Sequence, residues 1–376
     1  MTVMVLSSHT PSLIWFRLDM MVAFKECGHK VVAVGNEDET TWSDRFQPYG
    51  IKYRKATIER NGTNPFKDLK TMHSLREIMR QERPDKIFAY NAKTVIYGGL
   101  AAHKERIAFY PLIAGLGSVF MGRGLKNRLV RTILKIEYKQ SLKHSRRVFF
   151  QNQDDVDVFV KKRMVREEKV AMLHGSGVNL EAFKVQKLPD RFGFLYIGRL
   201  IRDKGVFEYL EACRIVKQAY PTIRCLLVGP FDSNPSALKK EELKSYLDDG
   251  TVEYFGEQTD VRPFLAQCCV FVLPSYREGT PKTVLEAMAS YKAVITSDAP
   301  GCRETVIDGE NGYLVPVKDP VTLAKKMIAL YEQPDLIKAM AERGRKMAED
   351  LFDVNKINEK IVLIMKLKEE TNEQTV

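Results

Sequence analysis

The sequence has no apolar run of the length that a transmembrane helix needs, about 18 residues, so we expect no segment to cross a bilayer. Residues 2–6 carry neither a basic segment nor a long apolar core, which argues against a secretory signal. The six cysteines form no Cys-x-x-Cys pair and no zinc-like spacing. This pattern predicts buried free thiols in a reducing cytosol and gives no sign of a bound metal.

A glycine-rich dinucleotide fingerprint is also missing. Residues 7–12, Ser-Ser-His-Thr-Pro-Ser, follow the first predicted strand, where that fingerprint would place its glycines. A close approach of the backbone to a pyrophosphate needs glycine at those positions, so the sequence argues against a nicotinamide-dependent enzyme. We expect no cofactor.

Acidic residues are scarce in the first half of the chain. Residues 1–185 contain 32 Lys and Arg against 19 Asp and Glu, a net charge of +13, whereas the remaining residues contain 27 and 29 and carry −2. The whole excess of +11 therefore belongs to the first half. A chain of 376 residues is expected to form two domains, and the change in charge favours a boundary near residue 185.

Strand-like and helix-like segments alternate along both halves. Short β-branched apolar runs predict strands, and residues 13–25 and 65–79 have helical spacing. The second half repeats the pattern and ends in helical segments near residues 320–331, 336–350 and 354–367. The predicted strands are residues 3–6, 30–34, 86–89, 107–112, 146–150, 169–173, 194–197, 224–228, 252–255, 270–273, 293–296 and 313–315.

Such alternation is typical of a doubly wound, mostly parallel sheet. We therefore predict an α/β fold with two Rossmann-like, doubly wound domains facing across a cleft, residues 1–185 and residues 186–376. The last helix, about residues 354–370, is predicted to pack back on the first domain.

One strand-to-helix connection carries much of the chemistry. After the strand at residues 270–273, Thr280 can cap the following helix and Pro281 suits its first turn. Two carboxylates, Glu278 and Glu286, flank the connection and can accept hydrogen bonds from sugar or ribose hydroxyls. Open α/β sheets bind ligands outside the carboxyl ends of their strands, and a helix N-terminus favours a phosphate. The stretch therefore predicts a nucleotide-sugar site.

Two cations follow an earlier strand of the same half. Arg199 and Lys204 lie between the strand at residues 194–197 and the next predicted helix. A forked guanidinium and an ammonium at such a position can hold one diphosphate from two sides. The alternative is a pair of solvated charges in a surface turn, because Arg and Lys side chains are mostly exposed. The acidic pair in the same half favours the diphosphate interpretation.

These residues together resemble the retaining glycosyltransferases of family 4. The likeness rests on Glu278 and Glu286 with Gly198-Arg199 and Lys204-Gly205, and it extends over most of the chain. Further matching segments are residues 174–183, Gly229-Pro230, Gly256 with Asp260, and Ser297-Asp298 with Gly301 and Glu304. The resemblance implies a GT-B fold, a donor site in the second half, retention of anomeric configuration and no divalent metal.

The resemblance also implies residue roles. Arg199, Lys204 and Glu278 would be catalytic, the two cations holding the leaving diphosphate and Glu278 the donor sugar. Glu286 would bind the ribose hydroxyls. The donor-binding set is completed by residues that line the base, the phosphates and the sugar: Gly198, Gly256, Gly279, Thr280, Pro281, Lys282 and Thr283.

The first half is similar to the family members that extend undecaprenyl-diphosphate-linked sugars. Asn91-Ala92-Lys93-Thr94 and Gly115-Leu116-Gly117 carry that likeness. It implies a lipid-linked acceptor, for which the expected binding residues are His9, Arg17, Lys93, Gly115 and Gly117. For His9 alone, simple packing is an equally good interpretation.

A basic helix is predicted between residues 121 and 147. Its cations include Arg123, Lys126, Arg128, Arg131, Lys135 and Lys139. A basic amphipathic helix is typical of an anionic membrane surface, which predicts a cytoplasmic protein peripheral to the inner face of the bacterial membrane. A solvated basic helix is the alternative, and nucleic-acid binding is not favoured because no nucleic-acid motif accompanies the charge.

The resemblance thus implies transfer of a sugar, for example an N-acetylhexosamine such as GalNAc, from a UDP-sugar to an undecaprenyl-diphosphate-linked saccharide. The assembly of a bacterial surface polysaccharide or glycoprotein glycan would need such a step. Two other classes stay open at this point: a UDP-N-acetylhexosamine epimerase with the same fold, and a membrane-bound scaffold that binds no sugar nucleotide.

Overall fold

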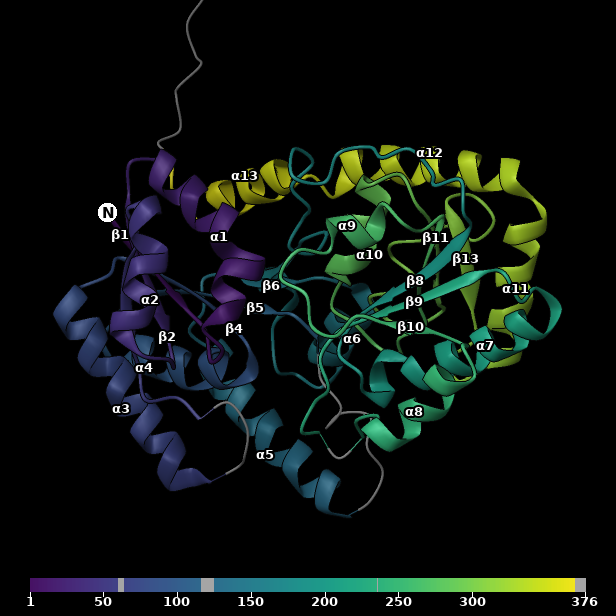
Figure 1. Cartoon of the computed structure of the whole chain (residues 1–376). Coiled ribbons are helices and arrows are strands. Elements are labelled where there is room, and N and C mark those ends of the chain that lie inside the picture. The colour runs from purple at the N-terminus through teal and green to yellow at the C-terminus, as the bar shows by residue number, and fades with distance from the viewer. Residues whose placement is uncertain (60–63, 116–124, 235, 369–376) are drawn as a thin grey trace, which may run out of the picture. The chain divides into compact units, whose positions relative to one another are not determined.

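The computed structural model describes residues 1–59, 64–115, 125–234 and 236–368 (Figure 1). The chain divides into two compact units by its internal contacts. Unit 1 comprises Met1–Ser176 with Val354–Val376, and unit 2 comprises Gly177–Asp353. The contacts thus divide the chain after Ser176, somewhat before the position that the change in charge favoured, and they assign the last helix to unit 1.

Unit 1 contains a seven-stranded sheet in which all neighbouring strands are parallel. The strand order is β3-β2-β1-β4-β5-β6-β7. The order therefore reverses between β1 and β4, which is the topological switch point of this unit. The strands are β1 Thr2–Leu6, β2 Lys30–Gly35, β3 Lys52–Lys55, β4 Lys86–Tyr90, β5 Ala108–Ile113, β6 Val148–Phe150 and β7 Val170–Met172.

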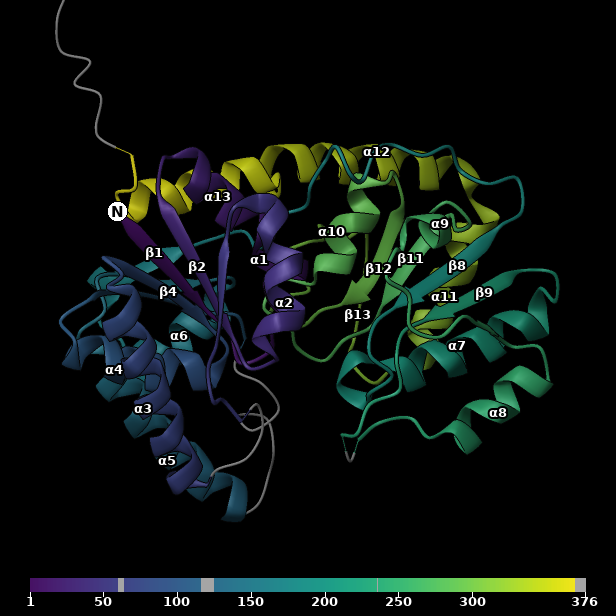
Figure 2. The same ribbon diagram turned by 60° about the vertical axis from the view of Figure 1, so that its left-hand side comes forward.

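Helices cover both faces of this sheet. Successive strand residues point to opposite faces, so Val3 and Val5 join one buried cluster and Met4 and Leu6 join another. The first cluster also takes residues from α1, α2 and α13, and Figure 1 shows α13 beside α1. Figure 2 shows α3, α4 and α5 together. The helices are α1 Pro11–Glu26, α2 Glu39–Phe46, α3 Pro65–Glu82, α4 Gly99–Lys104, α5 Leu125–Leu142, α6 Gln153–Lys161 and α13 Val354–Ile364.

Unit 2 repeats the architecture with a six-stranded parallel sheet of order β10-β9-β8-β11-β12-β13. Its switch point lies between β8 and β11. One hydrophobic core holds this unit together. The elements are β8 Gly193–Ile197, α7 Val206–Ala219, β9 Arg224–Val228, α8 Lys240–Asp248, β10 Glu253–Tyr254, α9 Arg262–Leu265, β11 Val270–Leu273, α10 Lys282–Ala289, β12 Ala293–Ser297, β13 Gly312–Val315, α11 Pro320–Glu332 and α12 Pro334–Leu351.

The predicted α/β class with two Rossmann-like sheets is therefore confirmed. Five of the six cysteines are buried and Cys27 is half-buried, and all six are free thiols. Within the part of the chain that the structure describes, no helix combines the length and the apolar character that crossing a membrane requires.

Candidate functional site

The switch point of unit 2 brings two predicted loops together. The cation loop, residues 198–205, follows β8, and the acidic loop, residues 274–281, follows the neighbouring strand β11. The backbone N–H of Tyr276 donates to the carbonyl oxygen of Asp203 at 2.9 Å and joins the two loops directly. Both loops therefore lie at the carboxyl ends of adjacent parallel strands, where open α/β sheets bind ligands.

Lys204 and Glu278 meet between these loops. The ammonium of Lys204 lies 2.5 Å from Oε1 of Glu278. The Lys204 side chain is 25% exposed and that of Glu278 is 10% exposed, so the pair is mostly shielded from water but reachable. One residue predicted to hold the diphosphate and one predicted to bind the sugar are thus in direct contact.

Arg199 lies on the same loop but reaches another partner. Its Nη1 is 3.0 Å from Oδ2 of Asp232, in the connection between β9 and α8. The buried hydroxyl of Tyr196 lies 3.2 Å from each of the carbonyl oxygens of Arg199 and Lys204, and its single hydrogen is shared between them. Tyr196 therefore fixes the backbone that carries the side chains of Arg199 and Lys204.

Two glycines allow this loop to pack closely. Gly205 has a φ of +72°, and a Cβ there would lie 2.0 Å from the carbonyl oxygen of Pro274. Gly229 follows β9, and its Cβ would lie 1.8 Å from the carbonyl oxygen of Gly198. The N–H of Gly229 donates to the carbonyl oxygen of Gly256 at 2.8 Å. Gly229 therefore serves the close packing of the β8 and β9 ends, whereas Gly256, after β10, has no heavy atom within 4 Å of its Cβ position and leaves room for a ligand.

Helix α10 begins one residue later than the predicted cap implied. Pro281, not Thr280, occupies the N-cap position, and it supplies no side-chain cap bond to the helix. Proline lacks an N–H, so it fits at this boundary without loss of a donor. Gly279 is buried, whereas Thr280, Lys282 and Thr283 are half-buried, and the first N–H groups of α10 have no acceptor within the helix.

Glu286 lies one turn into α10 and is buried. Burial raises the pKa of its carboxyl to about 7, an effect that the nearby Lys282 ammonium opposes. Nζ of Lys282 lies 3.9 Å from Oε1 of Glu286, which is too long for a strong hydrogen bond. The carboxylate can therefore accept hydrogen bonds from a ligand's hydroxyl groups.

A second buried carboxylate supports the acidic loop. The hydroxyl of Tyr276 donates to Oε1 of Glu208, on α7, at 2.6 Å. Together with the backbone bond of Tyr276 to Asp203, this contact fixes the acidic loop against the cation loop and α7. Glu208, Tyr276 and Asp232 were absent from the residues predicted from sequence. Tyr276 lies in the acidic loop itself, whereas only the fold brings Glu208 and Asp232 to the site.

The switch point of unit 1 gathers polar side chains at the ends of β1 and β4. Asn91 has a φ of +74°, and its Oδ1 accepts from the hydroxyl of Ser7 at 2.9 Å and from the N–H of Ser8 at 3.2 Å. His9 lies in the loop between β1 and α1, edge-on to Trp15 with their ring centroids 5.6 Å apart. This is the place in unit 1 where a ligand is expected.

Three other predicted acceptor residues besides Arg17 belong to the sequence of unit 1: Lys93, Gly115 and Gly117. Lys93 pairs with the buried Asp68, and the hydroxyl of Tyr97 bridges Asp68 and Glu137 at 3.0 and 2.8 Å. Gly115 follows β5 with a φ of +118°. Gly117 lies outside the described residues.

Arg17 is the buried cation of this region. It lies on α1, is 3% exposed, and places its guanidinium 4.9 Å from the ring centroid of Tyr90 and 5.7 Å from that of Phe88. Burial lowers the pKa of Arg17 to about 10, so the side chain stays charged at neutral pH. The contacts that its guanidinium makes among the described residues are with the faces of these two aromatic rings.

The predicted membrane helix is α5. Arg123 lies outside the described residues, as does the side chain of Lys126. The structure leaves a stripe of apolar side chains on α5 exposed: Leu129, Ile133 and Ile136. Of the remaining predicted cations, Arg131 is half-buried and three are exposed: Arg128, Lys135 and Lys139.

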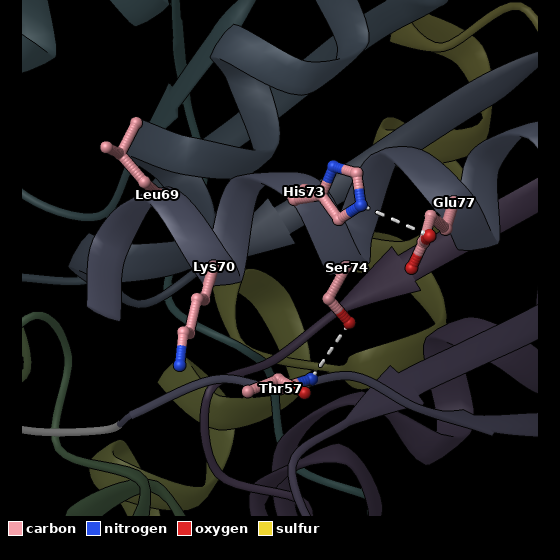
Figure 3. A pocket seen from close by; sticks show the side chains of 6 residues that line it. All are labelled: Thr57, Leu69, Lys70, His73, Ser74 and Glu77. Atoms are coloured by element: carbon pink, nitrogen blue, oxygen red, sulfur yellow. Dashed lines mark hydrogen bonds and ion pairs between the residues drawn. The ribbon is translucent and has the colours of Figure 1, made fainter. Parts of the chain in front are cut away.

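Two further features lie away from these sites. Among the described residues, no group of three or more His, Cys, Asp or Glu side chains is close enough to hold a metal ion. An open hollow of about 430 Å³ lies beside α3. Figure 3 shows residues that line it: His73 meets Glu77, and Ser74 accepts from the N–H of Thr57. None of the predicted site residues lines this hollow.

Comparison with known protein families covers both units. Residues 178–347 match the family described as "Glycosyl transferases group 1", and residues 5–152 match the one described as "Glycosyl transferase 4-like". The first match contains the cation and acidic loops, and the second contains the polar cluster at the switch point of unit 1.

Individual proteins match most of the chain. It is 30% identical over 346 residues to the N,N'-diacetylbacillosaminyl-diphospho-undecaprenol alpha-1,3-N-acetylgalactosaminyltransferase of Campylobacter jejuni, covering 88% of this chain and 89% of that relative. Sucrose-phosphate synthase from Thermosynechococcus elongatus superposes with a TM-score of 0.80 at 18% identity, covering 97% and 98% of the two chains. The Anabaena protein HepE, solved with UDP and glucose, superposes with a TM-score of 0.78 at 18% identity, covering 97% and 99%.

Proposed function

Because the chain belongs to the family-4 glycosyltransferases and has their GT-B fold, we propose that it transfers a sugar from a UDP-sugar to an undecaprenyl-diphosphate-linked saccharide, with retention of anomeric configuration. The observation that carries the proposal is the contact of Lys204 with Glu278 at the switch point of unit 2. The Campylobacter relative, named for a diphospho-undecaprenol substrate and an N-acetylgalactosamine product, supports the acceptor class and an N-acetylhexosamine such as GalNAc as the sugar.

In this proposal unit 2 binds the donor. Arg199 and Lys204 hold the diphosphate together with backbone N–H groups before and at the start of α10, and Glu278 binds the sugar. The N–H donors belong to Gly279, Thr280, Lys282 and Thr283, because Pro281 has none. Glu286 accepts hydrogen bonds from the ribose hydroxyls, and the backbone of Gly198 and Gly256 borders the base. The UDP bound to the HepE protein supports uracil as the base.

The chemistry follows from where charge develops. As the bond between the anomeric carbon and the diphosphate breaks, negative charge builds on the leaving oxygen, beside Arg199 and Lys204. The acceptor hydroxyl forms the new bond on the same face of the sugar, and its proton passes to that leaving oxygen. Positioned cations that stabilise such developing charge usually make the largest contribution to catalysis, and here they occupy the role that a divalent metal has elsewhere.

Unit 1 binds the acceptor in this proposal. The acceptor residues in this proposal are His9, Arg17, Lys93, Gly115 and Gly117. The four that the structure describes, His9, Arg17, Lys93 and Gly115, lie at or near the switch point of that unit. Lys93 already pairs with Asp68, so its use by an anionic acceptor requires the exchange of one carboxylate for a phosphate.

We further propose that α5 holds the protein on an anionic membrane surface. Leu129, Ile133 and Ile136 are three to four residues apart and therefore share one face of the helix. The exposed cations Arg128, Lys135 and Lys139 flank that face. An apolar stripe beside a basic one is the pattern of a helix that lies in the headgroup region, and each cation there contributes about 1 kcal/mol. Association with the cytoplasmic leaflet would place the enzyme beside its lipid-linked acceptor.

The two alternatives receive less support. The Campylobacter relative, which aligns along most of the chain, is named as a transferase, which does not favour an epimerase. Membership in an enzyme family, with a cation and a carboxylate in contact at the switch point, does not favour a scaffold that lacks a sugar-nucleotide site.

A donor panel followed by an acceptor assay tests the proposal. We expect UDP and UDP-sugars to raise the unfolding temperature more than GDP- or ADP-sugars, because a ligand of the native state stabilises it. With the cognate donor and bacterial lipid-linked sugars, mass spectrometry should detect one added sugar. Arg199→Ala and Lys204→Ala should each lower kcat by about 100-fold or more. If both variants keep wild-type turnover, the assignment of the donor site is wrong.

A further inference from the structure

A charged side chain lies inside the apolar layer between α1 and the sheet of unit 1. Leu13, Arg17, Met20 and Phe24 are three to four residues apart on α1 and all face the sheet, where the other three join the hydrophobic cluster. A charge in such a layer loses its hydration, and this cost is usually recovered through an ion pair or hydrogen bonds. Arg17 has neither an ion pair nor a hydrogen bond within the described residues, and its Nε is fully enclosed.

The direction of α1 aims this guanidinium at the edge of the sheet. Helical side chains lean toward the N-terminus of their helix, and α1 starts at the carboxyl edge, just after β1. The guanidinium is accordingly closer to the ring of Tyr90, the last residue of β4, than to that of Phe88. It therefore lies directly behind the switch point between β1 and β4.

The neighbouring polar groups are already satisfied by one another. Oγ of Ser12 donates to the carbonyl oxygen of His9 at 2.6 Å and lies 3.0 Å from the hydroxyl of Tyr90. Ser7 completes the set through Ser12 and the side chain of Asn91, at 3.0 and 2.9 Å. These contacts hold the Tyr90 ring as a fixed platform for the guanidinium, whose stacking supplies a cation–π attraction but uses none of its N–H donors.

From this geometry we propose that Arg17 binds an anionic group of the acceptor, a phosphate or a carboxylate, at the switch point of unit 1. The proposal rests on the proposed transferase function and deepens it, because it makes a negative charge on the acceptor a condition for tight binding. The planar fork of a guanidinium matches two oxygens of either anion. Two sources are possible: the diphosphate of the lipid carrier and a uronic-acid carboxylate on the acceptor saccharide.

Calorimetric titration of the full chain tests the proposal. Saturating UDP occupies the donor site, and inorganic pyrophosphate or glucuronate is then titrated into wild type, Arg17→Met and Arg45→Met. Arg45 is the matched control, because its guanidinium also stacks on an aromatic ring, Trp42, at 4.6 Å, but is exposed. We expect at least one anion to bind wild type and Arg45→Met alike and Arg17→Met about tenfold more weakly. The anion affected more identifies the source.

Equal affinities of Arg17→Met and wild type for both anions, or no binding of either anion to wild type, would overturn the proposal. UDP binding to wild type is measured first in the same experiment. A lack of UDP binding contradicts the proposed function, whereas normal UDP binding with equal anion affinities contradicts only the role of Arg17.

Thermal unfolding separates this role from a structural one. Methionine fills a similar volume without a charge, so Arg17→Met should unfold at the same or a higher temperature than wild type while losing anion affinity. In the transfer reaction the same variant should raise the KM for the acceptor and leave the KM for the donor unchanged. A variant that unfolds at a lower temperature and keeps its anion affinity and acceptor KM would show that Arg17 only supports the fold.

Discussion

At the scale of single residues, both donor-site cations hold a carboxylate where the proposed ligand would present a diphosphate. Lys204 contacts Glu278, and Arg199 contacts Asp232. Donor binding would therefore exchange one anionic partner for another. The Arg199 pair is the weaker of the two because Arg199 is 45% exposed, and exposed pairs contribute only about 0.2–1 kcal/mol.

This exchange predicts an unusual effect of Asp232→Asn. Removing the carboxylate frees Arg199 and removes a negative charge near the diphosphate, so the KM for the UDP-sugar should fall by about two- to fivefold with little change in kcat. Steady-state kinetics with varied donor measures this. Asp249→Asn is a matched control, because Asp249 likewise pairs with an arginine, Arg214, and accepts a backbone N–H two residues on. An unchanged or higher KM in Asp232→Asn would show that Asp232 does not compete with the donor.

Glu286 predicts a dependence on pH. Its pKa of about 7 in the folded chain exceeds the ordinary value of 4.5, so the folded state binds this proton more tightly than the unfolded state does. The carboxyl is neutral in both states below about pH 4.5. Its buried charge then costs stability progressively up to about pH 7, in total on the order of 3 kcal/mol.

Chemical unfolding of wild type and Glu286→Gln at several pH values measures this effect. The difference in stability between the two should shift in favour of the variant as pH rises from about 5 to 8. Affinity for UDP should rise over the same range in wild type alone, because the ionised carboxylate is the better acceptor for ribose hydroxyls. A pH-independent difference between the two proteins would contradict the raised pKa.

At the scale of elements, the sequence was sufficient to predict the strands that are buried on both faces. The predicted boundaries of β9 and β11 agree with the structure, and the other predicted strands agree within about two residues at each end. Helix α2 and strand β3 were not predicted, because they bury only Trp42, Phe46 and Tyr53 and are otherwise polar. Such short elements depend on the sheet beside them and carry too little periodicity of their own.

The same distinction applies to the candidate site. Lys204, Glu278 and Glu286 could be selected because each follows a recognisable strand end. The partners of the cation loop could not be selected from the sequence. Asp232, which pairs with Arg199, lies in a different loop. The hydroxyl that contacts the carbonyl oxygens of Arg199 and Lys204 belongs to Tyr196, inside a strand that is otherwise apolar in the sequence. Long-range contacts of this kind are decided by the order of the strands.

Helix α5 provides the prediction at this scale. The triple variant Leu129→Gln, Ile133→Gln and Ile136→Gln should lose at least about tenfold of its affinity for vesicles of phosphatidylglycerol and phosphatidylcholine, because three apolar side chains no longer enter the bilayer. Sedimentation with vesicles measures the bound fraction. Val321→Gln, an equally exposed apolar position on α11, serves as the control. Wild-type binding by the triple variant would exclude insertion of this face and leave only electrostatic attraction.

At the scale of the whole molecule, each unit has its own hydrophobic core and unit 1 depends on the far end of the chain. Ile361 of α13 is fully buried against the cluster that contains α1. Ile361→Ala should therefore destabilise unit 1 by about 2–5 kcal/mol and leave UDP binding by unit 2 unaffected. Calorimetry with and without UDP measures both effects. Leu363→Ala, on the exposed side of the same helix, should change neither; a loss of UDP binding in Ile361→Ala would show that the two units do not respond separately.

The return of α13 to unit 1 also fixes an order of events during synthesis. The ribosome completes the sheet strands of unit 1 first, yet the residues of α1 that α13 covers must wait until all of Gly177–Asp353 has been translated. Unit 2, although later in the chain, can finish folding earlier. Until the last helix emerges, the nascent chain carries an uncovered apolar surface on its oldest part, which is where a chaperone would be expected to bind.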